Sequence, residues 1–141
     1  MTLDLADRLA IHETLARLDH AVDAGDWNAY LAHYADDATL DPGFAPPVSG
    51  RDAIRAFLVA TEGNTRGKRH VASNVFVDET TTNAVATSYL VVIEREDIPK
   101  IIATAVIVDT FARRDGQWKI VHHKVAIDPG MFKAFAQQQS G

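Results

Sequence analysis

Apolar residues in the first part of the chain recur at helical spacing. Ile11, Leu15, Leu18 and Val22 follow one another in steps of four, three and four, which places them on one face of a helix. The pattern predicts a helix over residues 2–24 that Gly25 ends as a C-terminal cap. Two shorter helices are predicted over residues 27–34 and 51–61, with a short strand over 38–40 and a proline- and glycine-rich loop over 41–50 between them.

The period of the hydrophobic pattern changes to two in the second half of the chain. Segments rich in Val, Thr, Tyr and Ile predict four strands, over residues 69–77, 84–94, 101–113 and 117–128. The pair Asp115-Gly116 separates the last two strands and predicts a hairpin turn. A last helical turn is expected over 132–135, followed by a frayed end over 137–141.

This order of elements predicts a fold of the α+β class. Helices come first and long strands follow, so we expect the helices to pack on one side of a bent antiparallel sheet. A length of 141 residues fits one domain, residues 1–141, which can fold without disulfides or a structural metal. Two of the strands are apolar on both faces, which indicates that a second subunit covers part of the sheet in a homodimer.

Charge and composition narrow the class of partner. The chain has 14 basic and 19 acidic residues, a net charge of −5, which argues against nucleic acid or an anionic membrane as the main partner. The absence of cysteine excludes disulfides and cysteine nucleophiles. The charged N-terminal segment predicts no signal peptide, and the longest apolar run, residues 101–108, is too short to span a bilayer. A cytoplasmic location is therefore expected.

Motifs for nucleotides, zinc and covalent hydrolysis are missing from the sequence. It contains no glycine-rich phosphate loop, no His-Glu-x-x-His helix and no Gly-x-Ser-x-Gly elbow. His122 and His123 are adjacent, but neighbouring side chains on a strand point to opposite faces and do not readily share one ion. We expect no metal site and no cofactor.

Two acids and a histidine have unusual positions. Asp23 lies in the last turn of the first predicted helix, where the helix dipole disfavours a negative charge by about 0.3–1 kcal/mol, and Asp19 lies one turn earlier. Both are either solvated surface acids, or Asp23 is kept there for a hydrogen-bonding partner. His70 begins the first long strand, where it is either a half-buried strand residue or lines a cavity on the face it shares with Ala72 and Asn74.

Five segments in order resemble the SnoaL-like branch of the nuclear-transport-factor-2-like superfamily. They are Ala21-Val22-Asp23-Ala24-Gly25-Asp26-Trp27, Tyr34-Ala35-Asp36-Asp37-Ala38, Gly50-Arg51-Asp52-Ala53-Ile54, Arg69-His70-Val71-Ala72-Ser73-Asn74 and Asp109-Thr110-Phe111-Ala112-Arg113-Arg114-Asp115-Gly116-Gln117-Trp118. The resemblance implies a cone-shaped barrel, in which a strongly bent antiparallel sheet surrounds a long N-terminal helix and an apolar pocket. It also implies a dimer formed through the sheet.

The same resemblance implies a catalytic pair. Scytalone dehydratase, bile-acid dehydratase and hexachlorocyclohexane dehydrochlorinase share an aspartate that matches Asp23 and a histidine that matches His70. Asp23 is then expected to accept a hydrogen bond from one ring nitrogen of His70, which leaves the other nitrogen as a general base, a contribution of about 10²–10⁴ in rate. Such a site suits dehydration, other eliminations or isomerisation of a small apolar oxygenated ligand.

The sequence also departs from these relatives. Leu18 occupies the position of a helpful tyrosine, and His123 stands where two of the enzymes carry an arginine. The leaving-group machinery of these relatives is therefore not reproduced. Weaker candidates for pocket residues are Tyr34, Asp41, Asn74, Tyr89, His123 and Leu18.

Three functions follow as hypotheses. The first is a lyase or isomerase that uses Asp23 and His70. The second is a ligand-binding or interaction module without chemistry, since one fold hosts many functions. The third is an enzyme like ketosteroid isomerase, whose base falls near Asp41 but whose oxyanion donors are absent at Leu18 and Val106.

Overall fold

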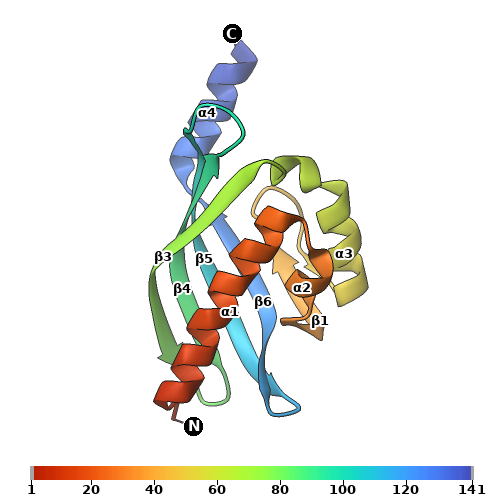
Figure 1. The fold of residues 1–141 in the computed structure, drawn as a ribbon, viewed down its shortest axis with the longest axis vertical. Coiled ribbons are helices and arrows are strands. Elements are labelled where there is room, and N and C mark those ends of the chain that lie inside the picture. The colour runs from red at the N-terminus through yellow and green to blue at the C-terminus, as the bar shows by residue number, and fades with distance from the viewer. Residues whose placement is uncertain (1, 141) are drawn as a thin grey trace.

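The long N-terminal helix crosses one face of the sheet. The computed structural model describes residues 2–140. Helix α1 spans Leu5–Ala24 and begins with a capping box, in which Asp4 and Asp7 each accept a hydrogen bond from the other's main-chain N–H. It ends at Gly25, whose φ of 66° is left-handed and therefore suits glycine. Figure 1 shows α1 lying diagonally over the strands.

Four shorter helical segments complete the helical part of residues 2–140. They are α2 (Trp27–Leu31), α3 (Arg51–Ala60), the 3₁₀ turn η1 (Glu62–Asn64) and α4 (Pro129–Ser140). Helix α2 is shorter than the predicted 27–34, because Tyr34 already begins the first strand. Helix α4 is longer than the expected single turn and includes residues 137–140, which were expected to fray; the end of that prediction, Gly141, lies outside the described residues. Pro129 suits the first turn of a helix, and the Ala- and Gln-rich sequence after it favours continuation.

Six strands form one bent sheet. They are β1 (Tyr34–Asp41), β2 (Val48–Ser49), β3 (Lys68–Glu79), β4 (Ala84–Glu94), β5 (Ile101–Arg114) and β6 (Gln117–Ile127), in the order β2-β1-β6-β5-β4-β3. The predicted α+β class is confirmed, and β4 has the predicted bounds. The sheet is not purely antiparallel, because β1 pairs with β6 in parallel. A parallel pair needs a long crossover, and most of the chain lies between these two strands.

The core fills the space between α1 and the inner face of the sheet. Ile11, Leu15 and Leu18 on α1 are buried, as the helical spacing predicts. Phe111 on β5 and Ile120 on β6 are paired in register and have no exposed surface. The alternation of buried and partly exposed residues along β5 shows which side chains face α1.

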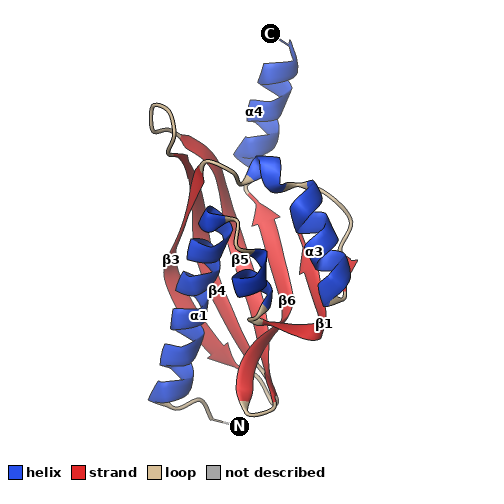
Figure 2. Cartoon of the chain, turned by 45° about the vertical axis from the view of Figure 1, so that its right-hand side comes forward, coloured by secondary structure: helices blue, strands red, loops and turns tan. Residues whose placement is uncertain are grey.

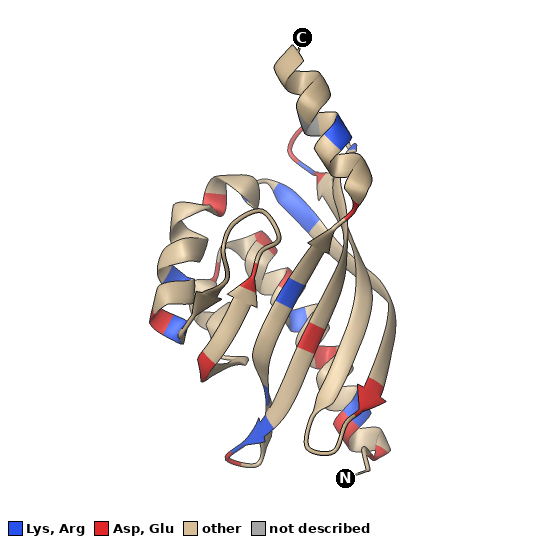
Figure 3. Cartoon of the chain, turned by 180° about the vertical axis from the view of Figure 1, so that it is seen from behind, with Lys and Arg blue, Asp and Glu red and all other residues tan. Residues whose placement is uncertain are grey.

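The central strands of the sheet contain few charged residues along their length (Figure 3). Phe76 on β3 and Tyr89 on β4 are exposed on the face away from α1, at 54 and 55%. Helix α4 extends past the end of the sheet, away from α1 (Figure 2). Within residues 2–140, none of the helices combines the length and the apolar character needed to cross a membrane.

Candidate active site

The end of α1 meets the start of β3. Asp23 lies in the last turn of α1, and His70 is the third residue of β3. Nδ1 of His70 lies 2.8 Å from Oδ1 of Asp23, and the main-chain N–H of His70 donates to the same oxygen at 3.0 Å. The two side chains are mostly buried, with exposed fractions of 12% for His70 and 19% for Asp23. These two hydrogen bonds hold a negative charge at a helix end that disfavours it.

This contact leaves the second ring nitrogen of His70 available. A carboxylate only accepts hydrogen bonds, so the neutral ring that donates through Nδ1 has its lone pair on Nε2. No hydrogen bond joins Nε2 to any residue that the structure describes. The arrangement therefore offers a proton acceptor of fixed orientation.

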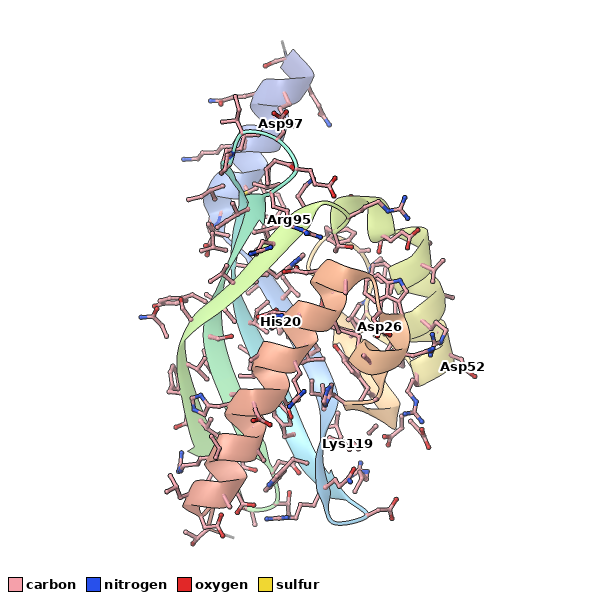
Figure 4. The ribbon with its side chains drawn as sticks, viewed as in Figure 1. His20, Asp26, Asp52, Arg95, Asp97 and Lys119 are labelled. Atoms are coloured by element: carbon pink, nitrogen blue, oxygen red, sulfur yellow. The ribbon has the colours of Figure 1, made fainter. Side chains whose placement is uncertain are left out.

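Arg95 forms hydrogen bonds both to the C-terminal end of α1 and to β3, the strand that carries His70. It follows β4 directly, and Figure 4 shows it at the C-terminal end of α1. Its Nη2 donates to the carbonyl oxygen of Asp23 at 2.9 Å, and its Nε donates to that of Lys68 at 2.8 Å. One guanidinium thus bridges α1 and β3 beside the Asp23–His70 contact.

A groove of about 540 Å³ lies between α1 and β3, a size in the range of small-molecule sites. The polar residues that line it are Asp19, His20, Asp23, Arg69, His70 and Arg95. Its apolar surface comes from alanines of both elements and from Val71. The groove therefore brings two carboxyl groups, two histidines and two arginines to one concave surface.

Asp19 is not the solvated acid that the sequence allowed. Its side chain is largely buried, and burial raises its pKa to about 7, with a further increase from the negative charges of Asp23 and Asp109. His123 and the main-chain amide of Ala72 act in the opposite direction. Asp19 consequently exchanges a proton near neutral pH.

A second Asp–His pair lies on the inner face of the sheet. Asp109 on β5 and His123 on β6 are paired in register, and Oδ1 of Asp109 lies 2.5 Å from Nδ1 of His123. Burial lowers the pKa of His123, but the charge and hydrogen bond of Asp109, together with Asp19, outweigh it and raise the pKa above its usual value. His123 is therefore held as a cation over a wider pH range than a free histidine.

Two tyrosines lie next to the Asp109–His123 pair. Tyr30, Tyr34, Asp109 and His123 together form a buried polar group in the core. The hydroxyls of Tyr30 and Tyr34 lie 2.8 Å apart, and the ring centroids of Tyr34 and His123 are 6.3 Å apart. Burial raises the pKa of both phenols well above the usual value, so both are neutral donors. The two hydroxyls satisfy each other in the core.

The profile of the SnoaL-like domain matches residues 3–124 of the chain. The protein belongs to the SnoaL-like family. A solved protein of unknown function with a cystatin-like fold, from Nostoc punctiforme, is 32% identical, with a TM-score of 0.86 over 93% of this chain and 98% of that one. A protein from Novosphingobium aromaticivorans named "Putative Scytalone Dehydratase" is 25% identical, with a TM-score of 0.76 over 88% of this chain and 85% of that one.

A third similar structure is a protein of unknown function from Mycobacterium tuberculosis. It is 22% identical, with a TM-score of 0.78 over 89% of this chain and 78% of that one, and it supports the fold alone. The SnoaL-like, NTF2-like fold group includes isomerases and dehydratases. Membership in the family therefore establishes the fold and does not specify the reaction.

The other sequence candidates of this SnoaL-like chain lie away from the groove. Leu18 is buried in the core, and Tyr89 is 55% exposed on the outer face. Asn74 is exposed at a register shift of β3, with a φ of 53°. Asp41 ends β1 and accepts a hydrogen bond from the N–H of Gly43 at 3.2 Å. Tyr34 and His123 belong to the buried polar group instead.

Sequence analysis did not single out the roles of Asp19, Asp109 and Arg95. Asp109 carries a signal, because it is the one charged residue on the buried alternation from Ala105 to Phe111. Asp19 also carries one, since it is four residues after Leu15 and next to Leu18, on the apolar side of α1. Arg95 lies in a charged connection, where nothing in the pattern marks it. Among residues 2–140, the structure contains no group of three His, Asp or Glu side chains arranged to hold a metal.

The substitution Asp19→Asn is expected to stabilise the protein at high pH. The pKa of about 7 in the folded state exceeds the usual aspartate value of 3.8, so the folded state binds more protons and wild-type stability falls as pH rises between these values. The advantage of Asp19→Asn grows over that interval and levels off above pH 7, at a value on the order of 3 kcal/mol.

Urea unfolding at a series of pH values measures this difference. The exposed Asp78→Asn on β3 serves as the control and is expected to show no such trend. A constant difference between Asp19→Asn and wild type across pH contradicts the explanation.

Proposed function

We propose that the protein is a cofactor-independent lyase or isomerase that removes a proton from a carbon atom of a small apolar oxygenated ligand. The observation that carries the proposal is the Asp23–His70 contact in the wall of the groove. A histidine whose Nδ1 is tied to a carboxylate and whose Nε2 is unoccupied is the arrangement that general-base catalysis needs.

The chemistry assigns a separate task to each group. Asp23 fixes the tautomer of His70 and stabilises the imidazolium that forms after proton transfer. Nε2 of His70 takes the proton from a carbon next to a carbonyl group, whose acidity makes such a step accessible. Arg95 holds α1 and β3 together, so the pair keeps its orientation while the ligand enters and leaves.

Two comparisons support this reaction class. The fold group includes isomerases and dehydratases, and one similar structure is named after a dehydratase. The third hypothesis, a base at Asp41, receives less support, because this carboxylate caps a turn and is not part of the groove lining. We therefore place the base at His70.

A binding module without chemistry is the second candidate. It is favoured by the tyrosines, since Tyr30 and Tyr34 bond to each other in the core and neither lines the groove. A groove without a tyrosine has fewer neutral donors for an enolate oxygen. Binding without proton transfer is the outcome that would identify this case.

Proton exchange on a simple ketone separates the two candidates. The probe is 1-tetralone, a bicyclic apolar ketone, in deuterated buffer. ¹H NMR follows the loss of the signal of the hydrogens on the carbon next to the carbonyl, as deuterium replaces them. We expect the protein to accelerate this exchange by at least about 100-fold over buffer. Saturation-transfer contact with the ketone but exchange at the buffer rate would establish binding alone and reject the enzyme.

A further inference from the structure

Asp19 and Asp23 form a helical pair in the same groove. They are four residues apart on α1, so their side chains are neighbours on one side of the helix. Both line the groove together with His70. Asp23 is engaged with His70, whereas the carboxyl of Asp19 meets the main-chain amide of Ala72 and is hydrogen-bonded by no side chain among the described residues. The groove thus contains one carboxylate that serves the base and one carboxyl that no other side chain engages.

We propose that Asp19 is the catalytic acid of this site, which donates a proton to the oxygen that leaves from a β-hydroxy ketone. This inference rests on the proposed function, since it supplies the partner for the base at His70. A hydroxide ion is a poor leaving group, so an elimination that releases it needs an acid as well as a base. Asp19 is the one groove carboxyl that can take this role without disrupting the Asp23–His70 contact.

The surroundings of Asp19 keep it in the form that can donate. Its side chain is largely buried, and the like charges of Asp23 and Asp109 act on it, so a protonated fraction of Asp19 persists at neutral pH, where a free aspartate is ionised. Two carboxyl groups in one site whose environments push their proton affinities apart are typical of an acid and a base with separate tasks. Here the two tasks fall to Asp19 and to the Asp23–His70 pair.

The second Asp–His pair supports Asp19 from inside the protein. Asp109 and His123 are outside the groove lining, yet both of their charges act on Asp19. The positive charge of His123 stabilises the carboxylate that remains after proton donation, which offsets the repulsion from Asp23. Asp19 therefore lies between two Asp–His pairs. The Asp23–His70 pair takes a proton from the substrate, and His123 of the other pair stabilises Asp19 after it has donated its own proton.

The step balances in protons and electrons. Nε2 of His70 takes the proton from the carbon next to the carbonyl, and the electron pair of that C–H bond forms the new C=C bond. The C–O bond at the neighbouring carbon breaks, and its electron pair stays on the oxygen. Asp19 gives its proton to this oxygen, which leaves as water. Exchange with solvent then removes the proton from His70 and returns one to Asp19.

Two tetralones that differ only in the leaving group test the assignment. The first is 3-hydroxy-1-tetralone, which loses water to give the fluorescent 1-naphthol. The second is 3-acetoxy-1-tetralone, which gives the same product and loses acetate, a group that needs no added proton. For Asp19→Asn we expect the rate ratio of acetate over water elimination to rise by about 100-fold relative to wild type. Asp19→Glu, which keeps an acid, is expected to restore part of the ratio.

Each outcome has a distinct meaning. An equal loss on both tetralones in Asp19→Asn, or no loss on either, overturns the role of Asp19 as acid. If the wild-type protein fails to exchange 1-tetralone, the proposed function itself is rejected. Asp78→Asn, on the exposed side of β3, is the matched control and should leave the ratio unchanged.

The pH profile gives a second measure that a purely structural role would not affect. Elimination of water by the wild type should decline as pH rises through about 7, where Asp19 loses its proton. The groups that act on this titration are Asp23 of α1, Asp109 of β5, His123 of β6 and the amide of Ala72 on β3. Elimination of acetate should lack this decline, and a decline of equal size for both leaving groups would contradict the proposal.

Discussion

His70→Gln lowers the rate of ketone exchange by about 10²–10⁴-fold, the usual contribution of a positioned general base. Glutamine has nearly the length of histidine but no basic nitrogen, so the groove keeps its shape and loses its proton acceptor. The main-chain N–H of residue 70 still donates to Asp23, so the end of α1 should keep its position. The measurement is the NMR exchange rate of 1-tetralone, with circular dichroism to show that the protein is folded.

The matched control is His12→Gln. His12 is an exposed histidine on the same helix as Asp23, so its loss should leave the exchange rate unchanged. Asp23→Asn should also lower the rate, and the double variant with His70→Gln should be no slower than His70→Gln alone, because the two residues act as one unit. Full exchange activity in His70→Gln would remove His70 from the reaction.

Phe111→Ala destabilises the fold by about 3–5 kcal/mol, the typical cost of truncating a buried aromatic side chain. Phe111 has no exposed surface and lies on the inner face of β5, opposite Ala84 of β4 and Ile120 of β6. Both of its pairing partners are in the core, so the space left by the ring has well-packed walls that relax only in part.

Urea unfolding measures this loss as a shift of the midpoint at constant slope. Phe76→Ala on β3 is the comparison, because that ring is 54% exposed and its removal should cost less than about 1 kcal/mol. A similar loss at both positions would mean that the inner face of the sheet is not the principal core.

Much of the fold could be predicted because short-range patterns dominate it. The helical spacing of Ile11, Leu15 and Leu18 gave α1 and its buried face, and Gly25 gave its end. The Asp-Gly turn gave the hairpin of β5 and β6. The parallel pairing of β1 with β6 could not be predicted, since it joins segments far apart in the chain and depends on how the helices direct the strand.

The candidate site also contains some residues that the sequence predicts and others that depend on long-range contacts. Asp23 and His70 drew attention through their positions at a helix end and a strand start and through the family resemblance, and the structure brings them into contact. The sequence is compatible with Asp19 as a solvated acid, because it does not show that β3 covers this side of α1. The pairing of Asp109 with His123 depends on strand register, which periodicity alone does not specify.

The parallel pairing of β1 with β6 also has a consequence for synthesis on the ribosome. Strands β3 to β6 pair with their neighbours in sequence, so each hairpin can form soon after its second strand emerges. Strand β1 is made early and can pair with β2 at once, but its other edge is paired only when β6 has left the exit tunnel. The edge of β1 that pairs with β6 therefore stays unpaired until the polypeptide is nearly complete, and during this interval a chaperone has an open strand edge to cover.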